Sequence, residues 1–173
     1  PITYRVSNSI PTTTVYEYAD FIRISQERVW GRLGVYTVAH EYGHAFHYVA
    51  IDPWIPSSFN NCPLNHSPGT AHSTACAYVE GFANFFAARV INVVDGYTAA
   101  SDALSQTVLE VNNFRLLGHN GLLDEGTFAA LLLDMVDLPG DDDGISGDDE
   151  TLVMSHFELT QVMRMCRTWN PTT

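Results

Sequence analysis

The segment VYTVAHEYGHAFHYVA, residues 35–50, constrains the fold of this chain more than any other. Its apolar residues recur at every third or fourth position, which predicts a mostly buried α-helix of about five turns. The same segment carries three histidines and a glutamate. Because buried imidazole and carboxylate groups need polar partners or a bound ion, the segment predicts a polar site inside an apolar helical core.

Residues 40–44, HEYGH, match the HExxH pattern. His40 and His44 are four positions apart and therefore lie on one face of the helix, where both imidazoles can bind one metal ion. Glu41 would then face the open coordination position and could accept a proton from metal-bound water. The alternative is that both histidines are core residues hydrogen-bonded to backbone, which requires partners that a core seldom supplies.

A catalytic zinc site needs a third protein ligand. His47 is about 10 Å from His40 by helix rise, too far for a shared tetrahedral ion, so we expect a supporting or surface role for it. Glu80 lies in a second apolar helical segment beside Gly81, whose missing side chain would let two helices approach closely. A buried carboxylate needs a cation, so Glu80 is the predicted third ligand.

The HEYGH segment, followed by EGFANFFA at residues 80–87, resembles the gluzincin metallopeptidases, the thermolysin-like branch of the zincins, of a bacterial secreted or surface kind. The resemblance covers residues 35–92. It implies that His40, His44 and Glu80 bind zinc and that Glu41 is the general base of peptide-bond hydrolysis. Metzincins are excluded, because their third histidine would fall at Ala50.

Two features bear on catalysis. Many gluzincins carry an Asp that orients the first histidine, and here Asn84 stands in its place; it can accept from an imidazole N–H but polarises the ring less. Peptide hydrolysis also needs a donor toward the oxyanion. The candidate donors are Tyr78, His72, His119 and His156, and the sequence does not choose among them.

These residues predict a zinc-dependent endopeptidase that acts on peptide or protein substrates. The alternative is a catalytically inactive zincin-like scaffold, a structural or assembly subunit of a larger protein, in which the metal is a staple. Asn84, the unidentified oxyanion donor and the unpaired Cys166 favour this alternative. A helix bundle without metal would require the HEYGH match to be accidental.

Cysteine placement bears on the compartment. Cys62 and Cys76 flank a polar, Pro- and Asn-rich stretch that a disulfide would staple, which favours a secreted, periplasmic or cell-surface location. The alternatives are reduced cysteines in a cytosolic protein, or a metal cluster with His66 and His72. Cys166 remains, either as a buried free thiol or in a bridge between chains.

The charge balance excludes one class of partner. The chain has 20 acidic against 8 basic residues, all Arg, and a net charge of −12, so it would repel nucleic acid. No apolar run is long enough for a transmembrane segment. The acidic stretch at 141–150 has oxygen ligands and glycines suited to Ca²⁺, and a solvated loop without calcium is the alternative.

The 173 residues predict one α+β, zincin-like domain. Residues 1–28 predict short strands in a small antiparallel sheet, 29–96 the zinc-binding helices and the disulfide loop, and 97–173 a mainly helical part. Helices are expected at 101–118, 122–137 and 155–169, the last opened by a capping box of Ser155 and Glu158. A stripe at helical spacing is predicted to be core: Phe82, Phe85, Phe86 and Val90.

Overall fold

The computed structural model describes residues 3–7, 15–17, 21–25, 32–51, 62, 73–95, 124–136 and 154–168. The strands are β1 (Thr3–Ser7), β2 (Val15–Glu17) and β3 (Phe21–Ser25). The helices are α2 (Arg32–Ile51), α3 (Thr74–Asp95), α5 (Glu125–Asp134) and α6 (His156–Thr168). The predicted helix at 101–118 and the acidic stretch at 141–150 lie outside the described residues, so both remain predictions.

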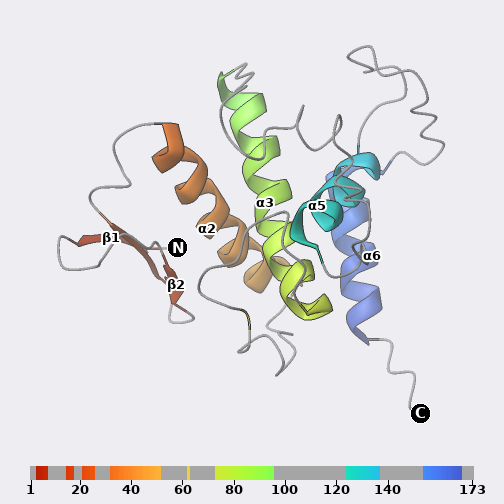
Figure 1. The fold of residues 1–173 in the computed structure, drawn as a ribbon. Helices are drawn as coiled ribbons and strands as arrows, with labels where there is room; N and C mark the ends of the chain where they lie inside the picture. The colour runs from red at the N-terminus through yellow and green to blue at the C-terminus, as the bar shows by residue number, and fades with distance from the viewer. Residues whose placement is uncertain are drawn as a thin grey trace.

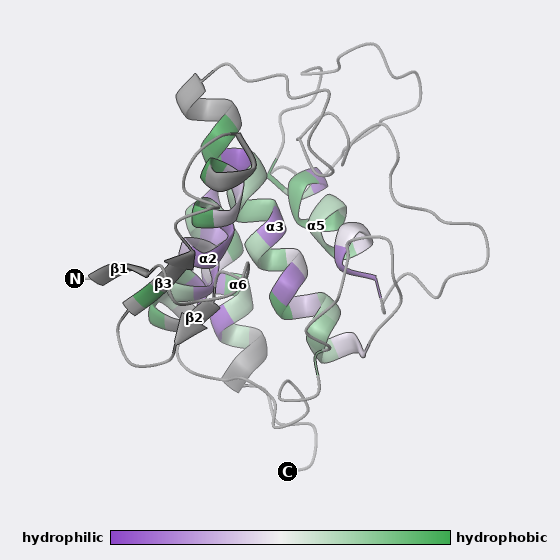
Figure 2. Ribbon diagram, turned by 60° about the vertical axis from the view of Figure 1, so that its left-hand side comes forward, coloured by the Kyte–Doolittle hydropathy of each residue, from purple (hydrophilic) through white to green (hydrophobic). Residues whose placement is uncertain are grey.

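Helix α3 is the central element. It packs against α2 on one side and against α5 on the other, and α6 also contacts α2 (Figure 1). The sheet packs against α2, so the order across the molecule is sheet, α2, α3 and α5. Helix α3 is hydrophobic over most of its surface, which suits a helix with neighbours on several sides, and hydrophilic residues interrupt it at a few positions (Figure 2).

The three strands form a mixed sheet in the order β1-β3-β2. Strands β2 and β3 are antiparallel, with Tyr16 opposite Ile22, whereas β1 and β3 are parallel, with Tyr4 opposite Ile22. The prediction of an antiparallel sheet was therefore wrong for the β1–β3 pair. Three strands that alternate in direction leave the first and third parallel, and here the third strand lies between the other two.

The main core lies where α3, α5 and α6 meet. It holds the buried side chains Phe82, Phe85, Ala88, Ala129, Ala130, Leu132, Leu133, Val136, Leu159 and Met163. A smaller cluster joins the sheet to α2, where Ile22 of β3 packs with Ala45. The predicted aromatic stripe is thus partly core, but Val90 is 37% exposed, so its assignment to the core was wrong.

Two glycines set the helix contacts. A Cβ on Gly43, within the HEYGH segment, would lie 2.9 Å from Cα of Ala83, so Gly43 permits the close approach of α2 and α3. A Cβ on Gly81 would lie 2.7 Å from the backbone oxygen of Glu125, so Gly81 faces α5. We expected Gly81 to permit the close approach of α2 and α3. This prediction was wrong, because Gly43 lies at the contact between these two helices.

Side chains fix the starts of three helices. At α3, Oγ of Ser73 accepts from the backbone N–H of Cys76, and Cys76 forms the predicted disulfide with Cys62, with 5.3 Å between the Cα atoms. At α5, Asp124 accepts from two backbone N–H groups. At α6, Ser155 and Glu158 form the predicted capping box.

Candidate metal centre

The candidate site lies between α2 and α3. Tyr36 and His40 of α2 contact Asn84 of α3, and His44 contacts Glu80 one turn earlier in α3. Because the contacts descend along α3 as they ascend along α2, the two helices run antiparallel. The four-residue spacings on each helix therefore bring these polar side chains together at one level of the interface.

Three side chains present ligand atoms toward one another. Nε2 of His40 lies 3.1 Å from Oε2 of Glu80, Nε2 of His44 lies 3.3 Å from the same oxygen, and the two nitrogens are 3.1 Å apart. The side chains are 14%, 11% and 7% exposed, so little water reaches them. Among the described residues, this trio forms a group that could hold a metal ion.

The hydrogen bond between Nδ1 of His40 and Asn84 determines the tautomer of His40. Oδ1 of Asn84 lies 2.7 Å from Nδ1 of His40 and can only accept, so Nδ1 donates and carries the ring proton. In the neutral ring, Nε2 therefore presents a lone pair to Glu80 and His44. Two lone pairs at these distances repel unless a proton or a metal ion lies between them, and one metal ion would satisfy all three atoms.

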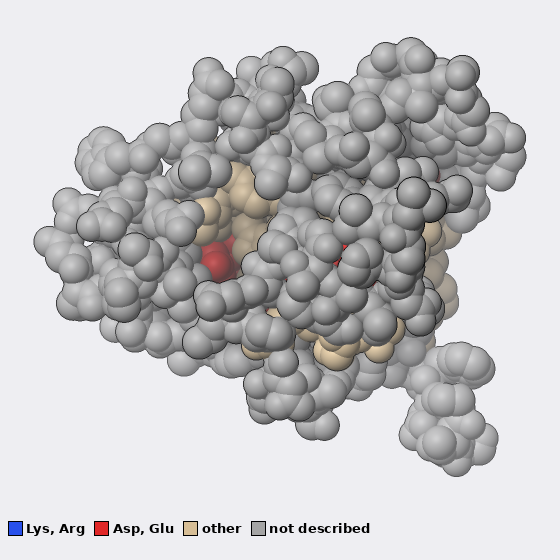
Figure 3. Space-filling view, viewed as in Figure 1, with Lys and Arg blue, Asp and Glu red and all other residues tan. Residues whose placement is uncertain are grey.

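The electrostatics also favour a cation. Burial acts to raise the pKa of Glu80, but the charge of His44 and the close contacts of His40 and His44 with the carboxylate outweigh burial and lower this pKa below its ordinary value. Glu80 is therefore held as a carboxylate. Figure 3 shows acidic atoms inside a hollow of the surface where α2 and α3 lie.

Glu41 lies beside the trio on α2. It is 7% exposed, which is unusual for a carboxylate. As the residue next to His40, it is turned about 100° around the helix axis from that candidate ligand. This position suits a base close to the site but outside the ligand set.

The profile of the mycolysin C-terminal domain family matches residues 1–173, which include the HEYGH segment and Glu80. The chain belongs to the mycolysin C-terminal domain family. Mycolysin-type proteins are metallopeptidases, and this agrees with the candidate metal centre. No curated protein and no solved structure matches the chain. None of the described helices of this mycolysin-family domain is long and apolar enough to cross a membrane.

Two of the predicted oxyanion donors, Tyr78 and His156, are among the described residues of this mycolysin-family domain and lie on different helices. The hydroxyl of Tyr78 is 2.9 Å from Nε2 of His47, and His156 stacks on Phe85 with ring centroids 6.3 Å apart. His72 and His119 lie outside the described residues, so their roles stay predictions. Cys166 falls within α6, but its side chain is not among those described.

His47 is a buried residue, so the surface role considered for it was wrong. It is 2% exposed and its ring packs edge-on against Phe82 and Tyr78. Burial, followed by the neighbouring charge of His44, lowers the pKa of His47 to about 4. His47 is therefore neutral near pH 7, with a hydroxyl as its partner.

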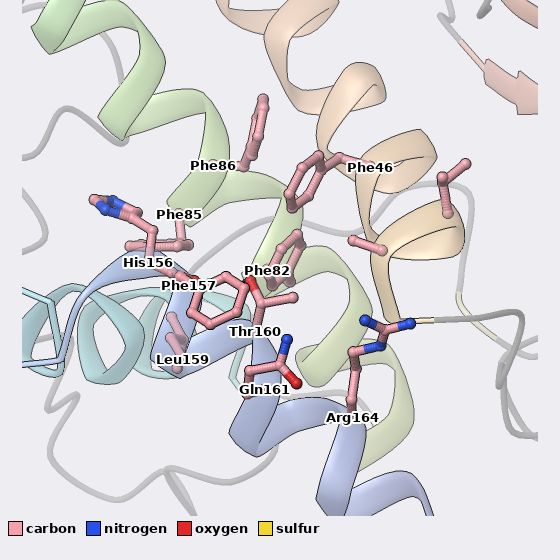
Figure 4. A pocket seen from close by; sticks show the side chains of 12 residues that line it. Phe46, Phe82, Phe85, Phe86, His156, Phe157, Leu159, Thr160, Gln161 and Arg164 are labelled. Atoms are coloured by element: carbon pink, nitrogen blue, oxygen red, sulfur yellow. Dashed lines mark hydrogen bonds between the residues drawn. The ribbon is translucent and has the colours of Figure 1, made fainter.

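The aromatic side chains of α2, α3 and α6 line a separate cavity of about 470 Å³. Phe46, Phe82, Phe85 and Phe86 line it from α2 and α3, with Arg164 of α6 at one end (Figure 4). None of the three candidate ligands belongs to its lining. The three phenylalanines of the stripe predicted as core therefore also line a cavity.

Sequence reasoning missed two polar residues beside the candidate centre. The hydroxyl of Tyr36 donates to Oδ1 of Asn84 at 2.9 Å. The amide nitrogen of Asn84 donates to Oε2 of Glu125 at 3.3 Å. Tyr36 precedes His40 by four residues, so helical spacing could have indicated it, but no spacing connects Glu125 with the HEYGH segment.

Proposed function

We propose that this domain is a zinc-dependent endopeptidase in which His40, His44 and Glu80 bind the metal. The triangle of ligand atoms, with sides of 3.1, 3.1 and 3.3 Å, carries the proposal. In a tetrahedral site with zinc bonds of about 2.0–2.1 Å, neighbouring ligand atoms would be about 3.3 Å apart. Two imidazoles and one carboxylate also form a ligand set of catalytic zinc sites, which keep one position open.

The residues of the chain would divide the chemistry among them. Zinc, when bound, supplies a Lewis acid that polarises the scissile carbonyl and lowers the pKa of a water molecule. Glu41 would accept the proton of the attacking water and return it to the leaving amine. Asn84 would orient the ring of His40 through Nδ1, as its short contact with that atom supports.

The setting proposed for this site is a zincin-like fold in an extracytoplasmic protein. The packing of a small sheet against α2, with α3 on the opposite side, supports the fold. The Cys62–Cys76 disulfide supports an oxidising compartment, as does the family, because mycolysin-type proteases are typically secreted.

The test compares the zinc-loaded protein with an equally zinc-loaded Glu41→Gln variant on a mixed peptide library. Because a general base contributes about 10²–10⁴-fold, we expect cleavage by the wild type and a loss of that size in the variant. Zinc content, measured by mass spectrometry of metals, should be the same in both. Equal cleavage by the two proteins would contradict the role of Glu41.

Absence of cleavage by both proteins, with zinc bound in each, would instead favour the catalytically inactive scaffold. The presence of Asn84 where gluzincins carry an Asp is the observation that favours this second function. In that case the metal would stabilise the packing of α2 against α3 and would take no part in catalysis.

A further inference from the structure

We propose that Glu125 is a positioning residue of the metal centre and acts on His40 through Asn84. The inference rests on the metal centre proposed above and adds to it a residue from α5. The carboxylate of Glu125 bonds to Asn84, and Asn84 contacts His40, so Glu125 would act on His40 through this amide.

One amide joins the carboxylate to the imidazole. The nitrogen of the Asn84 amide donates to Oε2 of Glu125 at 3.3 Å, and its oxygen accepts from His40 at 2.7 Å and from Tyr36 at 2.9 Å. Asn84 and Glu125 are 3% and 1% exposed. Water therefore competes little for these bonds, and the partners must match one another.

Glu125 thereby selects the orientation of the Asn84 amide. An amide can be turned so that its oxygen and nitrogen exchange places with almost no change in shape. The turned amide would place its oxygen against the carboxylate of Glu125, where two acceptors repel. It would also place its NH₂ group against Nδ1 of His40.

The amide orientation in turn selects the tautomer of His40. Facing an NH₂ group, Nδ1 would have to accept, and the ring proton would move to Nε2. Nε2 is the atom that faces Glu80 and His44, so a proton there would remove the lone pair needed by a metal ion. Glu125 thus keeps His40 in the tautomer able to bind metal.

As a carboxylate, Glu125 would also place a negative charge near the site. It occupies the first turn of α5, where the helix dipole favours an anion. An Asp at position 84 would place such a charge directly on His40. In this chain the charge lies one side chain further away and reaches the imidazole by polarising the amide between them.

Gly81 provides the space for this arrangement. A Cβ there would come within 2.7 Å of the backbone oxygen of Glu125 and 2.8 Å of Cβ of Phe128. A side chain at position 81 would therefore push the start of α5 away from α3. The glycine beside ligand Glu80 is what allows Glu125 to reach Asn84.

The test compares zinc affinity in wild type, Glu125→Gln, Asn84→Asp and the double variant. Glutamine at 125 no longer selects one amide orientation, so we expect affinity to fall about 10–100-fold. Aspartate at 84 opposite Glu125 places two carboxylates together, and we expect a similar loss. In the double variant, glutamine can donate to aspartate, so affinity should return to within about threefold of wild type.

Zinc affinity is measured by competition with a chromophoric chelator, and the visible spectrum of the Co²⁺-substituted proteins reports ligand geometry independently of activity. The spectrum should change in Glu125→Gln and return in the double variant. Thermal unfolding of the metal-free proteins separates a loss of stability from a loss of affinity. Glu158→Gln, on the exposed side of α6, is the matched control and should bind zinc like wild type.

Wild-type affinity in Glu125→Gln, or a double variant that binds no better than Glu125→Gln, would overturn the role of Glu125. If Glu125→Gln does not fold, a folded double variant with near wild-type affinity supports the inference. Loss of folding in both would contradict it, since the pair would then determine folding and not metal affinity. Failure of wild type to bind zinc would instead overturn the metal centre itself.

Discussion

The α2–α3 interface buries a histidine site at each of two levels, and the two sites differ in what the histidine faces. His40 faces Glu80 and His44, which offer a carboxylate oxygen and a ring nitrogen. His47 faces the hydroxyl of Tyr78, 2.9 Å away. The same helix pair thus contains one cluster suited to a cation, around His40, and one histidine paired with a hydroxyl, His47.

The difference lies in the chemistry of the partner. A hydroxyl can donate or accept, so it matches a neutral imidazole in either tautomer. A carboxylate can only accept, so it cannot match the lone pair of a neutral His40, whereas a cation bound between the two groups can. Burial of a histidine is therefore no sign of metal binding by itself. The group opposite the ring determines whether the site needs a cation.

The largest expected contrast is in zinc affinity. His44→Ala and Glu80→Gln each remove a proposed ligand and should lower the affinity by more than about 100-fold, beyond the 10–100-fold typical of an outer partner. His47→Gln should stay within about threefold of wild type. Competition with a chromophoric chelator measures the zinc affinity of all three variants. A loss of affinity in His47→Gln as large as in Glu80→Gln would contradict the distinction between the two histidine sites.

The next contrast concerns pH. In the unfolded chain His47 titrates near 6.5, whereas in the fold its pKa is about 4, so protons bind the unfolded chain more readily between these values. The contribution of neutral His47 to the free energy of unfolding is complete above pH 6.5 and falls as the pH decreases toward 4. From the size of the shift, the loss amounts to roughly 3 kcal/mol.

Urea unfolding of metal-free wild type and His47→Gln between pH 7 and pH 4 measures this contribution. We expect the stability of the variant to fall less steeply with decreasing pH. Parallel curves would show that His47 is protonated in the fold as easily as in the unfolded chain.

The smallest contrast comes from the two tyrosines. Tyr36→Phe and Tyr78→Phe each remove a hydroxyl that bonds to one of the sites, and each should lower the free energy of unfolding by about 1 kcal/mol. Tyr36→Phe should also weaken zinc binding a few-fold, because Asn84 loses one donor. Tyr78→Phe should leave zinc affinity unchanged. A chelator titration in which Tyr78→Phe binds zinc more weakly than Tyr36→Phe would contradict the assignment of the metal site to His40 and not to His47.

The parts of the candidate site that could be predicted from sequence are those that depend on helical spacing. His40 and His44 share a face of α2 because they are four positions apart, and an isolated carboxylate in the next apolar helix indicated Glu80. The capping box of α6 could be predicted for a similar reason, since the spacing of Ser155 and Glu158 is local.

Contacts between distant segments could not be predicted in this way. Glu125 follows a helix cap in the sequence, and nothing in its surroundings indicates a contact with Asn84. The glycines at 43 and 81 were both visible, but which helix each one faces depends on the packing of three helices. The strand order likewise depends on which edge of β3 pairs with β1. The alternation of apolar and polar residues along the strands does not determine this.

The most direct test of the metal centre is a crystal structure of the zinc-loaded protein with diffraction recorded at the zinc absorption edge. We expect one anomalous peak about 2.0–2.1 Å from Nε2 of His40, Nε2 of His44 and an oxygen of Glu80, and none at His47. A zinc peak elsewhere, with these three side chains bonded only to one another, would contradict it.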